Sequence, residues 1–177
     1  MNIRKATYSD IPRLMNIFSS ARQIMRDSGN LYQWDDSYPS EEIVKKDISD
    51  GVCQVLCNAD PVTGEEDITA VMAFIPGPDP TYKHIYEDTM MEIESAWPND
   101  DPYHVIHRIA VAKPGSGAFD KLIAWAFGNA STIRIDTHAD NVIMHHLMHK
   151  HGFIRCGIIR LASGAPRVAY IKTTSAQ

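Results

Sequence analysis

The sequence lacks the cysteine content of a protein stabilised by disulfides. It has three cysteines, an odd number, and no C-x-x-C pair. Cys53 and Cys57 fall in one expected strand, where four residues span about 13 Å, well beyond the reach of a disulfide. We therefore expect three reduced thiols that serve mostly as small core residues.

Long apolar runs and clustered basic residues are also missing. No apolar stretch approaches the length of a membrane span, and the N-terminal Met-Asn-Ile-Arg-Lys carries no apolar export segment. The net charge of −5 argues against a broad nucleic-acid surface, because such a surface needs Lys and Arg to displace counterions. We therefore expect a cytoplasmic protein with neither a membrane nor a nucleic-acid partner.

What is present fits one domain. The 177 residues, 44% apolar and 22% charged, have an ordinary globular composition. A chain of this length buries roughly 70% of the surface that it would expose when unfolded. There is no internal repeat, and the linker-like pieces are too short to divide the chain, so we expect a single domain over residues 1–177.

Hydrophobic periodicity and turn residues predict alternating strands and helices. Strands are expected at residues 2–7, 52–58, 67–75, 105–111, 133–137, 153–161 and 167–172, with a hairpin turn at 60–64. Helices are expected from 9–12 to Gly29, at 41–50, at 119–127 and after a cap at Asp140 or Asn141. A further helix is expected within residues 82–99, carrying Ile85, Met90 and Ile93. This order predicts an α/β (α+β) fold with a mixed sheet of about seven strands and helices on both faces.

The centre of the chain is a strand, a glycine turn and a helix. The turn reads Lys113-Pro114-Gly115-Ser116-Gly117-Ala118. A helix start aims unpaired N–H groups and the positive end of the helix dipole at one point, which makes an anion site, most often for phosphate. One such turn is a weak signal alone, because Gly-Ser-Gly between a strand and a helix is usually only a loop.

Two segments resemble the GNAT superfamily of acetyl-CoA-dependent N-acetyltransferases. The opening Ile3-Arg4-Lys5-Ala6-Thr7-x-x-Asp10-x-x-x-Leu14 is similar to the first strand and helix of that family. The run Asn141-x-x-Met144-x-x-Leu147-Met148-His149-Lys150-His151-Gly152-Phe153 resembles its N-x-x-A-x-x-L-Y-E-K-x-G-F element. The resemblance covers essentially the whole chain. It implies a GNAT-like fold, acetyl-CoA as co-substrate, and transfer of the acetyl group to a primary amine of a small molecule or peptide.

The resemblance also implies which residues hold the cofactor. The fourth strand would pair with the pantetheine arm, and the Val111 N–H would polarise the thioester carbonyl. The glycine turn would hold the pyrophosphate, with Lys113 in place of the family's arginine, and Asn141 would contact the pantetheine or fix the gap between strands. The residues so implied are Ile109, Ala110, Val111, Lys113, Gly115, Ser116, Gly117, Ala118 and Asn141.

The chain departs from the family pattern in two places. The usual turn, [Q/R]-x-x-G-x-[G/A], has no clean match, and a bulky Phe119 follows it; the helical spacing of Phe119 with Leu122 and Ile123 predicts that it faces the core. Many relatives place a tyrosine where this chain has Met148, and a thioether cannot give a proton to a departing thiolate.

An acceptor amine must lose a proton before it attacks, so the implied reaction needs a base. His104 and His107 lie on the fourth strand, but they differ by three and point to opposite faces, so only one can line a given cavity. His138 follows the fifth strand, where Asp136 and Asp140 could orient it. A structural role for each histidine stays open.

The histidines at 145, 146, 149 and 151 raise the possibility of a metal. His145 and His149 have ligand spacing on a helix, but no glutamate follows the first histidine and no third ligand is evident. A solvated helix face is the favoured interpretation, so we expect no metal.

Aromatic and acidic residues outside the expected core could shape a pocket for the amine. The acids Asp35, Asp36, Glu87 and Asp88 would favour a cationic substrate. A rival hypothesis is a non-catalytic GNAT-like module that binds an acyl-CoA or a protein partner, and the sequence does not distinguish a monomer from a homodimer. The aromatic candidates for the amine pocket are Trp34, Tyr38, Tyr82, Trp97 and Tyr103.

Overall fold

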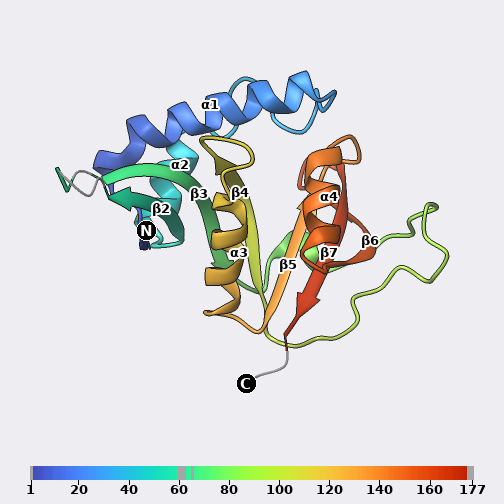
Figure 1. Ribbon diagram of the computed structural model, residues 1–177. Coiled ribbons are helices and arrows are strands. Elements are labelled where there is room, and N and C mark those ends of the chain that lie inside the picture. The colour runs from blue at the N-terminus through green and yellow to red at the C-terminus, as the bar shows by residue number, and fades with distance from the viewer. Residues whose placement is uncertain (1, 60–62, 65, 175–177) are drawn as a thin grey trace.

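The computed structural model describes residues 2–59, 63–64 and 66–174 and contains one seven-stranded mixed sheet (Figure 1). The strand order is β1-β2-β3-β4-β5-β7-β6, and all neighbours are antiparallel except β4 and β5. The strands are β1 (Asn2–Lys5), β2 (Cys53–Ala59), β3 (Glu66–Pro76), β4 (His104–Val111), β5 (Thr132–Thr137), β6 (Ile154–Arg160) and β7 (Pro166–Thr173).

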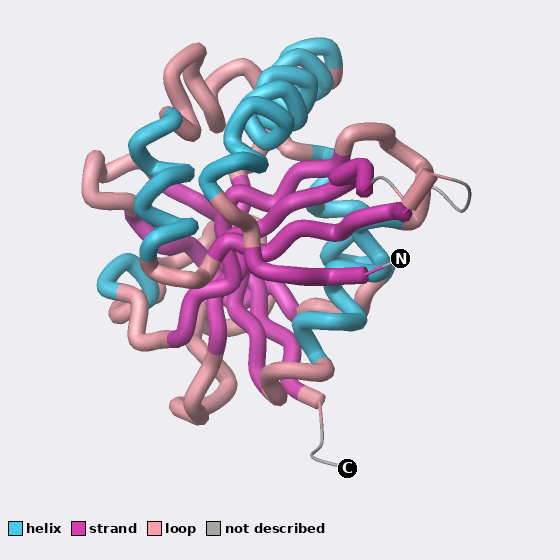
Figure 2. Tube along the Cα trace, turned by 90° about the vertical axis from the view of Figure 1, so that its left-hand side faces the viewer, coloured by secondary structure: helices cyan, strands magenta, loops and turns pink. Residues whose placement is uncertain are grey.

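Helices cover both faces of the sheet (Figure 2). On one face, α1 (Ile11–Asp27) and α2 (Glu41–Ser49) bury Leu14, Phe18 and Val44 against the first strands. On the other, α3 (Ala118–Phe127) and α4 (Val142–Lys150) bury Leu122 and Met148 against the central strands. The expected mixed sheet with helices on both faces is confirmed, and each predicted strand and these four helices form within a few residues of the expected bounds.

The helix expected within residues 82–99 is wrong. Only a short 3₁₀ helix, η2 (Pro80–Tyr82), forms there, and it ends before Ile85. The segment that follows is instead tied to β6: Tyr86 and Ile158 exchange backbone hydrogen bonds of 2.7 and 3.1 Å. Gly157 makes this close approach possible, because a Cβ there would lie 2.7 Å from the Ile85 side chain. Pairing with the sheet therefore overrides the apolar spacing, and Met90 stays exposed.

The parallel pairing of β4 with β5 is short. It holds only from His104–Ile133 to Ile106–Ile135, and beyond that the strands separate (Figure 1). Just past the last pair, the register between β3 and β4 shifts at a bulge, where Arg108 has a left-handed φ of 51°. The bulge and the separation open a gap in the sheet at the C-terminal half of β4.

Cys53, Cys57 and Cys156 are buried free thiols. No helix in the described part of the chain has both the length and the apolar character needed to cross a bilayer. Residues 60–62 of the expected hairpin turn lie outside the described residues, whereas the strands on either side pair as a hairpin.

Candidate active site between β4 and β5

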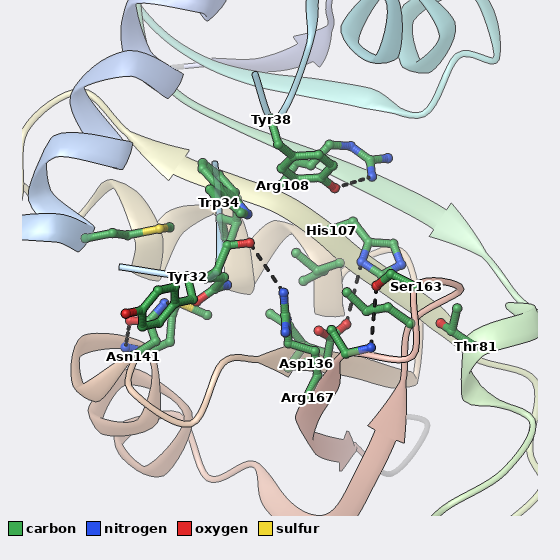
Figure 3. A pocket seen from close by; sticks show the side chains of 18 of the residues that line it. Tyr32, Trp34, Tyr38, Thr81, His107, Arg108, Asp136, Asn141, Ser163 and Arg167 are labelled. Atoms are coloured by element: carbon green, nitrogen blue, oxygen red, sulfur yellow. Dashed lines mark hydrogen bonds and ion pairs between the residues drawn. The ribbon is translucent and has the colours of Figure 1, made fainter. Parts of the chain in front are cut away.

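Two cavities meet where β4 and β5 separate. We call the first the polar cavity; its volume is about 470 Å³, and it lies beside β4, β5 and the start of β7 (Figure 3). The second, the turn cavity, has about 330 Å³ and lies between β4, the glycine turn and α4. The residues that line both are Met25, Ile109, Asn141 and Met144. The two cavities are therefore adjacent, with these four residues as their common wall.

The glycine turn forms the end of the turn cavity. Gly115 and Gly117 have φ of 73° and 74°, the left-handed conformation that glycine adopts without strain, and Gly117 is the N-cap of α3. No atom lies within 4 Å of where a Cβ would stand on either residue, so the backbone is open to a ligand. The first N–H groups of α3 and the helix dipole favour an anion at this end. Lys113 also lines the cavity and adds a positive charge.

The Val111 N–H points into the gap rather than into the sheet. Ala112 donates its backbone N–H to the Thr69 carbonyl at 2.8 Å, and Val111 is opposite Ala70 in the same register. Because backbone groups in an antiparallel ladder alternate in direction, the N–H of Val111 faces away from β3. That direction is the side that β5 has left, so this donor is available to a ligand.

Phe119 does not block the turn cavity. Its side chain is 9% exposed, belongs to the core cluster under α3 and lies against His151, with ring centroids 5.4 Å apart. Asp120, the next residue, holds both Lys150 and His151 by hydrogen bonds of 2.7 to 2.9 Å. The outer wall of this cavity therefore carries an ion pair, and Phe119 faces the core as its helical spacing predicts.

His107 lines the polar cavity between two carboxylates. Its Nε2 lies 3.0 Å from Asp79 Oδ2, and its Nδ1 lies 3.8 Å from Asp136 Oδ1, which also accepts the Tyr82 hydroxyl at 2.6 Å. Burial raises the pKa of Asp79, but hydrogen bonds from His107 and Thr81 outweigh it and lower that pKa to about 2. Because Asp79 is thus an ionised acceptor, Nε2 carries the imidazole proton and the lone pair of neutral His107 is on Nδ1.

Gln33 connects the loop after α1 to the start of α4. Its side-chain oxygen accepts from Asn141 Nδ2 at 2.8 Å, and from Asn30 Nδ2 at 2.8 Å. Asn141 in turn caps α4 by accepting the Met144 N–H at 3.1 Å. Asn141 is 3% exposed and lines both cavities, so this contact fixes the wall where they join.

Only two of the five aromatic candidates line the polar cavity. Trp34 and Tyr38 do, and their rings meet edge to face at 5.8 Å. Tyr82, Trp97 and Tyr103 instead form a separate aromatic cluster: Trp97 stacks on Tyr82, with centroids 5.6 Å apart. The Arg134 guanidinium lies 4.1 Å from the Trp97 ring and 3.9 Å from the Tyr103 ring. The expected pocket wall is corrected accordingly, because these three rings pack together in the segment from η2 to β4.

His104 and His138 lie outside both linings. His104 stacks on Phe74 on the other face of the sheet, with centroids 4.4 Å apart. His138 accepts the Asp140 N–H at 3.2 Å through Nδ1. Burial lowers the pKa of each of these imidazoles. Of the three histidines proposed as the base, His107 alone lines the polar cavity.

The histidines of α4 are separated by their hydrogen bonds. His145 Nδ1 accepts the Tyr170 hydroxyl at 2.6 Å, and its Nε2 donates to the carbonyls of His138 and Ala139. His151 binds Asp120. Within the described residues, no group of three or more His, Cys, Asp or Glu side chains is arranged to hold a metal ion.

The acidic residues named from the sequence mostly lie elsewhere. Asp35 lines the polar cavity, but Asp36 is exposed and pairs with Arg26. Glu87 and Asp88 line a separate hollow in the segment between η2 and β4. Of the four acids expected to favour a cationic substrate, only Asp35 lines the polar cavity.

The residues that define the polar cavity come from distant parts of the chain. Asp79, Gln33 and Arg167 were not identified from the sequence, and Asp136 was considered only as a partner of His138. No local pattern marks them, because η2, β5 and β7 come together only in the folded sheet. Only Asp136 has a local sequence pattern that could have identified it, because it follows the alternating apolar residues of a strand.

The comparisons agree with this geometry. No protein-family model and no curated protein matches the sequence. An acetyltransferase of the GNAT family from Streptococcus agalactiae 2603 is 28% identical, with a TM-score of 0.82 over 99% of this chain and 96% of that one. One from Listeria monocytogenes 4b F2365 is 19% identical, with a TM-score of 0.65 over 98% and 94%. The NatC complex, solved with Gag peptide and CoA, contains a chain 13% identical, with a TM-score of 0.54 over 98% of both chains.

The split sheet and these neighbours define an acyltransferase fold, and they support acyl transfer as its general chemistry. The chain has the fold of the GNAT acetyltransferases, as its opening strand and helix and its Asn141-to-Phe153 run predict.

Proposed function

We propose that the protein transfers the acetyl group of acetyl-CoA to a primary amine by direct attack while both substrates are bound. The observation that carries the proposal is the junction of the two cavities at the end of the β4–β5 pairing. The turn cavity fits a CoA ester: it has a glycine turn at a helix start for the pyrophosphate and an apolar wall from Ile143, Met144 and Leu147 for the pantetheine.

His107 is the proposed base. An amine that enters the polar cavity meets Nδ1 of His107, whose other nitrogen is held by Asp79. The amine proton moves to Nδ1, and the carboxylate of Asp79 stabilises the imidazolium that forms. Asp136 lies 3.8 Å from Nδ1 and attracts the amine in its ammonium form before that proton is lost.

The Val111 N–H is the proposed donor to the thioester carbonyl. As the amine nitrogen forms its bond to the carbonyl carbon, negative charge develops on the oxygen, and a fixed N–H in the gap stabilises it. The carbon–sulfur bond then breaks. The four residues shared by the cavities carry no acidic proton, so the departing thiolate takes its proton from the His107 imidazolium or from water.

Calorimetry and turnover together test the proposal. Titration of the purified protein with acetyl-CoA should show binding at one site per chain. Thiol release from acetyl-CoA should then depend on an added amine and fall in His107→Ala. Absence of binding by both acetyl-CoA and CoA would refute the proposal.

A non-catalytic module that binds an acyl-CoA is the second candidate. It is favoured by the lack of an acid at the junction, since Met148, at the position of the family's tyrosine, is 0% exposed in the core. It predicts binding of acetyl-CoA without thiol release on any amine. Turnover on a single amine that depends on His107 would exclude it.

A further inference from the structure

Arg167 is a buried cation that donates to no carboxylate among the residues that the structure describes. It lies at the start of β7, is 7% exposed and lines the polar cavity (Figure 3). Its guanidinium donates to two neutral carbonyls, that of Pro166 at 2.8 Å and that of Gln33 at 3.3 Å. Among the residues that the structure describes, it forms no ion pair with a carboxylate. The two carbonyls use only part of its five N–H donors.

The other arginine of this cavity is neutralised. Arg108 makes two hydrogen bonds to the Asp47 carboxylate, at 2.7 and 2.8 Å. The buried Arg134 lies between two aromatic rings outside the cavity. Arg167 therefore differs from both: it is held out of water, and the carboxylate that would offset its charge is absent from its hydrogen-bond partners.

The burial of Arg167 makes a partner of opposite charge favourable. Burial lowers the pKa of its guanidinium, yet arginine stays charged in proteins. Taking a charge out of water is costly unless a partner of opposite charge is supplied. The charge of Asp136 on β5 partly offsets the effect of burial on the pKa, but Asp136 accepts the Tyr82 hydroxyl, faces His107 and forms no hydrogen bond with Arg167. A ligand is the remaining source of a partner.

We propose that Arg167 binds a carboxylate on the acceptor, so that the substrate of the proposed acetyl transfer is an amine that also carries a carboxylate, as an amino acid does. The amine would lie toward His107 on β4 and the carboxylate toward Arg167 on β7. The cavity also holds Asp35, Asp79 and Asp136, which would repel a doubly charged phosphate more than a carboxylate. A single planar guanidinium matches the two oxygens of a carboxylate.

This inference rests on the proposed function and extends it. The test uses sets of three acceptors: an amino acid, its carboxamide and the amine left when the carboxyl group is removed. Phenylalanine, alanine and glutamate supply such sets. Because the carboxamide has the less basic amine, a preference for the carboxylate over it cannot come from easier loss of the proton. The native protein, Arg167→Met, Arg167→Lys and Arg160→Met are compared, with Arg160 as the matched control because it is exposed on β6.

The expected result is a preference for the carboxylate member of at least one set. In kcat/KM for thiol release, it should exceed the carboxamide and the decarboxylated amine by roughly 10- to 100-fold, the value of a hydrogen bond to a charged group. Arg167→Met should abolish this preference with little change for the decarboxylated amine. Arg167→Lys should keep part of it, and Arg160→Met all of it.

Calorimetry separates failure of the inference from failure of the proposed function. If acetyl-CoA does not bind, the proposed function fails, and direct titration with each acceptor still decides the role of Arg167. Equal affinity for all three members of every set, or a preference that survives in Arg167→Met, overturns the inference. So does an equal loss for all three in Arg167→Met, which is the result of a purely structural role. Melting followed by circular dichroism checks folding, and Arg167→Lys decides the question if Arg167→Met does not fold.

Discussion

Arg108 and the buried Asp47 form an ion pair that holds the bulge of β4 against α2. Arg108 is the only non-glycine with a left-handed φ in the described part of the chain, 51°, and its Nε and Nη2 donate to the two Asp47 oxygens at 2.7 and 2.8 Å. Residues held in this conformation cost about 1–3 kcal/mol and persist because their surroundings fix them. The pair therefore fixes the bulge beside which the two cavities join.

Asp47→Asn should destabilise the fold, because it leaves the Arg108 charge buried without its partner. We expect a loss of about 3–5 kcal/mol in the free energy of unfolding. Glu41→Gln on the same helix is the matched control: the Glu41–Lys45 pair is exposed, and its loss should cost less than about 1 kcal/mol. Urea denaturation measures both, and equal effects would contradict this account.

His107→Gln should lower kcat for acetyl transfer by about 100- to 10,000-fold, the usual contribution of a positioned base. Asp79→Asn should also lower kcat, because it removes the carboxylate that keeps the imidazole proton on Nε2. The loss should be smaller than in His107→Gln, because the imidazole itself remains. His104→Gln is the control from the opposite face of β4 and should leave kcat unchanged. Initial rates of thiol release measure all three. A large loss of kcat in His104→Gln would show that the base lies on the other face of the sheet.

Asp79 should make stability depend on pH in the acid range. Its pKa in the fold is about 2, below the ordinary 3.8, so its contribution is complete above about pH 4 and is lost as the pH falls toward 2. The difference corresponds to about 2 kcal/mol. Urea midpoints at pH 5 and pH 2.5 should therefore differ less in Asp79→Asn than in the native protein. Unchanged pH dependence in the variant would show that the carboxylate is not held in this way.

Val111→Pro should impair catalysis more than folding. The proline removes an N–H that faces the gap, and we expect kcat to fall by about 100- to 1,000-fold, as for loss of one oxyanion donor. Ala112→Pro removes instead the hydrogen bond to the Thr69 carbonyl within the sheet. It should lower the melting temperature more than Val111→Pro does. Comparable kcat in Val111→Pro and the native protein would exclude the role given to this donor.

The order of the elements was predictable because each carries its own signals. The Ser40 cap of α2, the Asn141 cap of α4 and the alternating sequence of β5 act within a few residues, and the structure contains both caps and the strand. The segment after η2 was not predictable in the same way. Its conformation depends on contacts distant in sequence, such as the ion pair of Asp88 with Arg155 of β6.

The site was predictable only in part, for the same reason. The glycine turn and Asn141 belong to local motifs and could be named from the sequence. The surroundings of His107 could not, because Asp79 lies 28 residues before it and Asp136 lies 29 residues after it in the chain. Arg167 has no local pattern at all, and only the fold reveals that it lacks an acidic partner.

Only three residue pairs join β4 to β5, so the sheet consists of two parts with few hydrogen bonds between them. A ligand with amide groups that lies in the gap would form hydrogen bonds with the strand backbone and act as a temporary eighth strand. A bound ligand would then connect the two parts of the sheet, and it would slow amide hydrogen exchange in the strands on both sides of the gap.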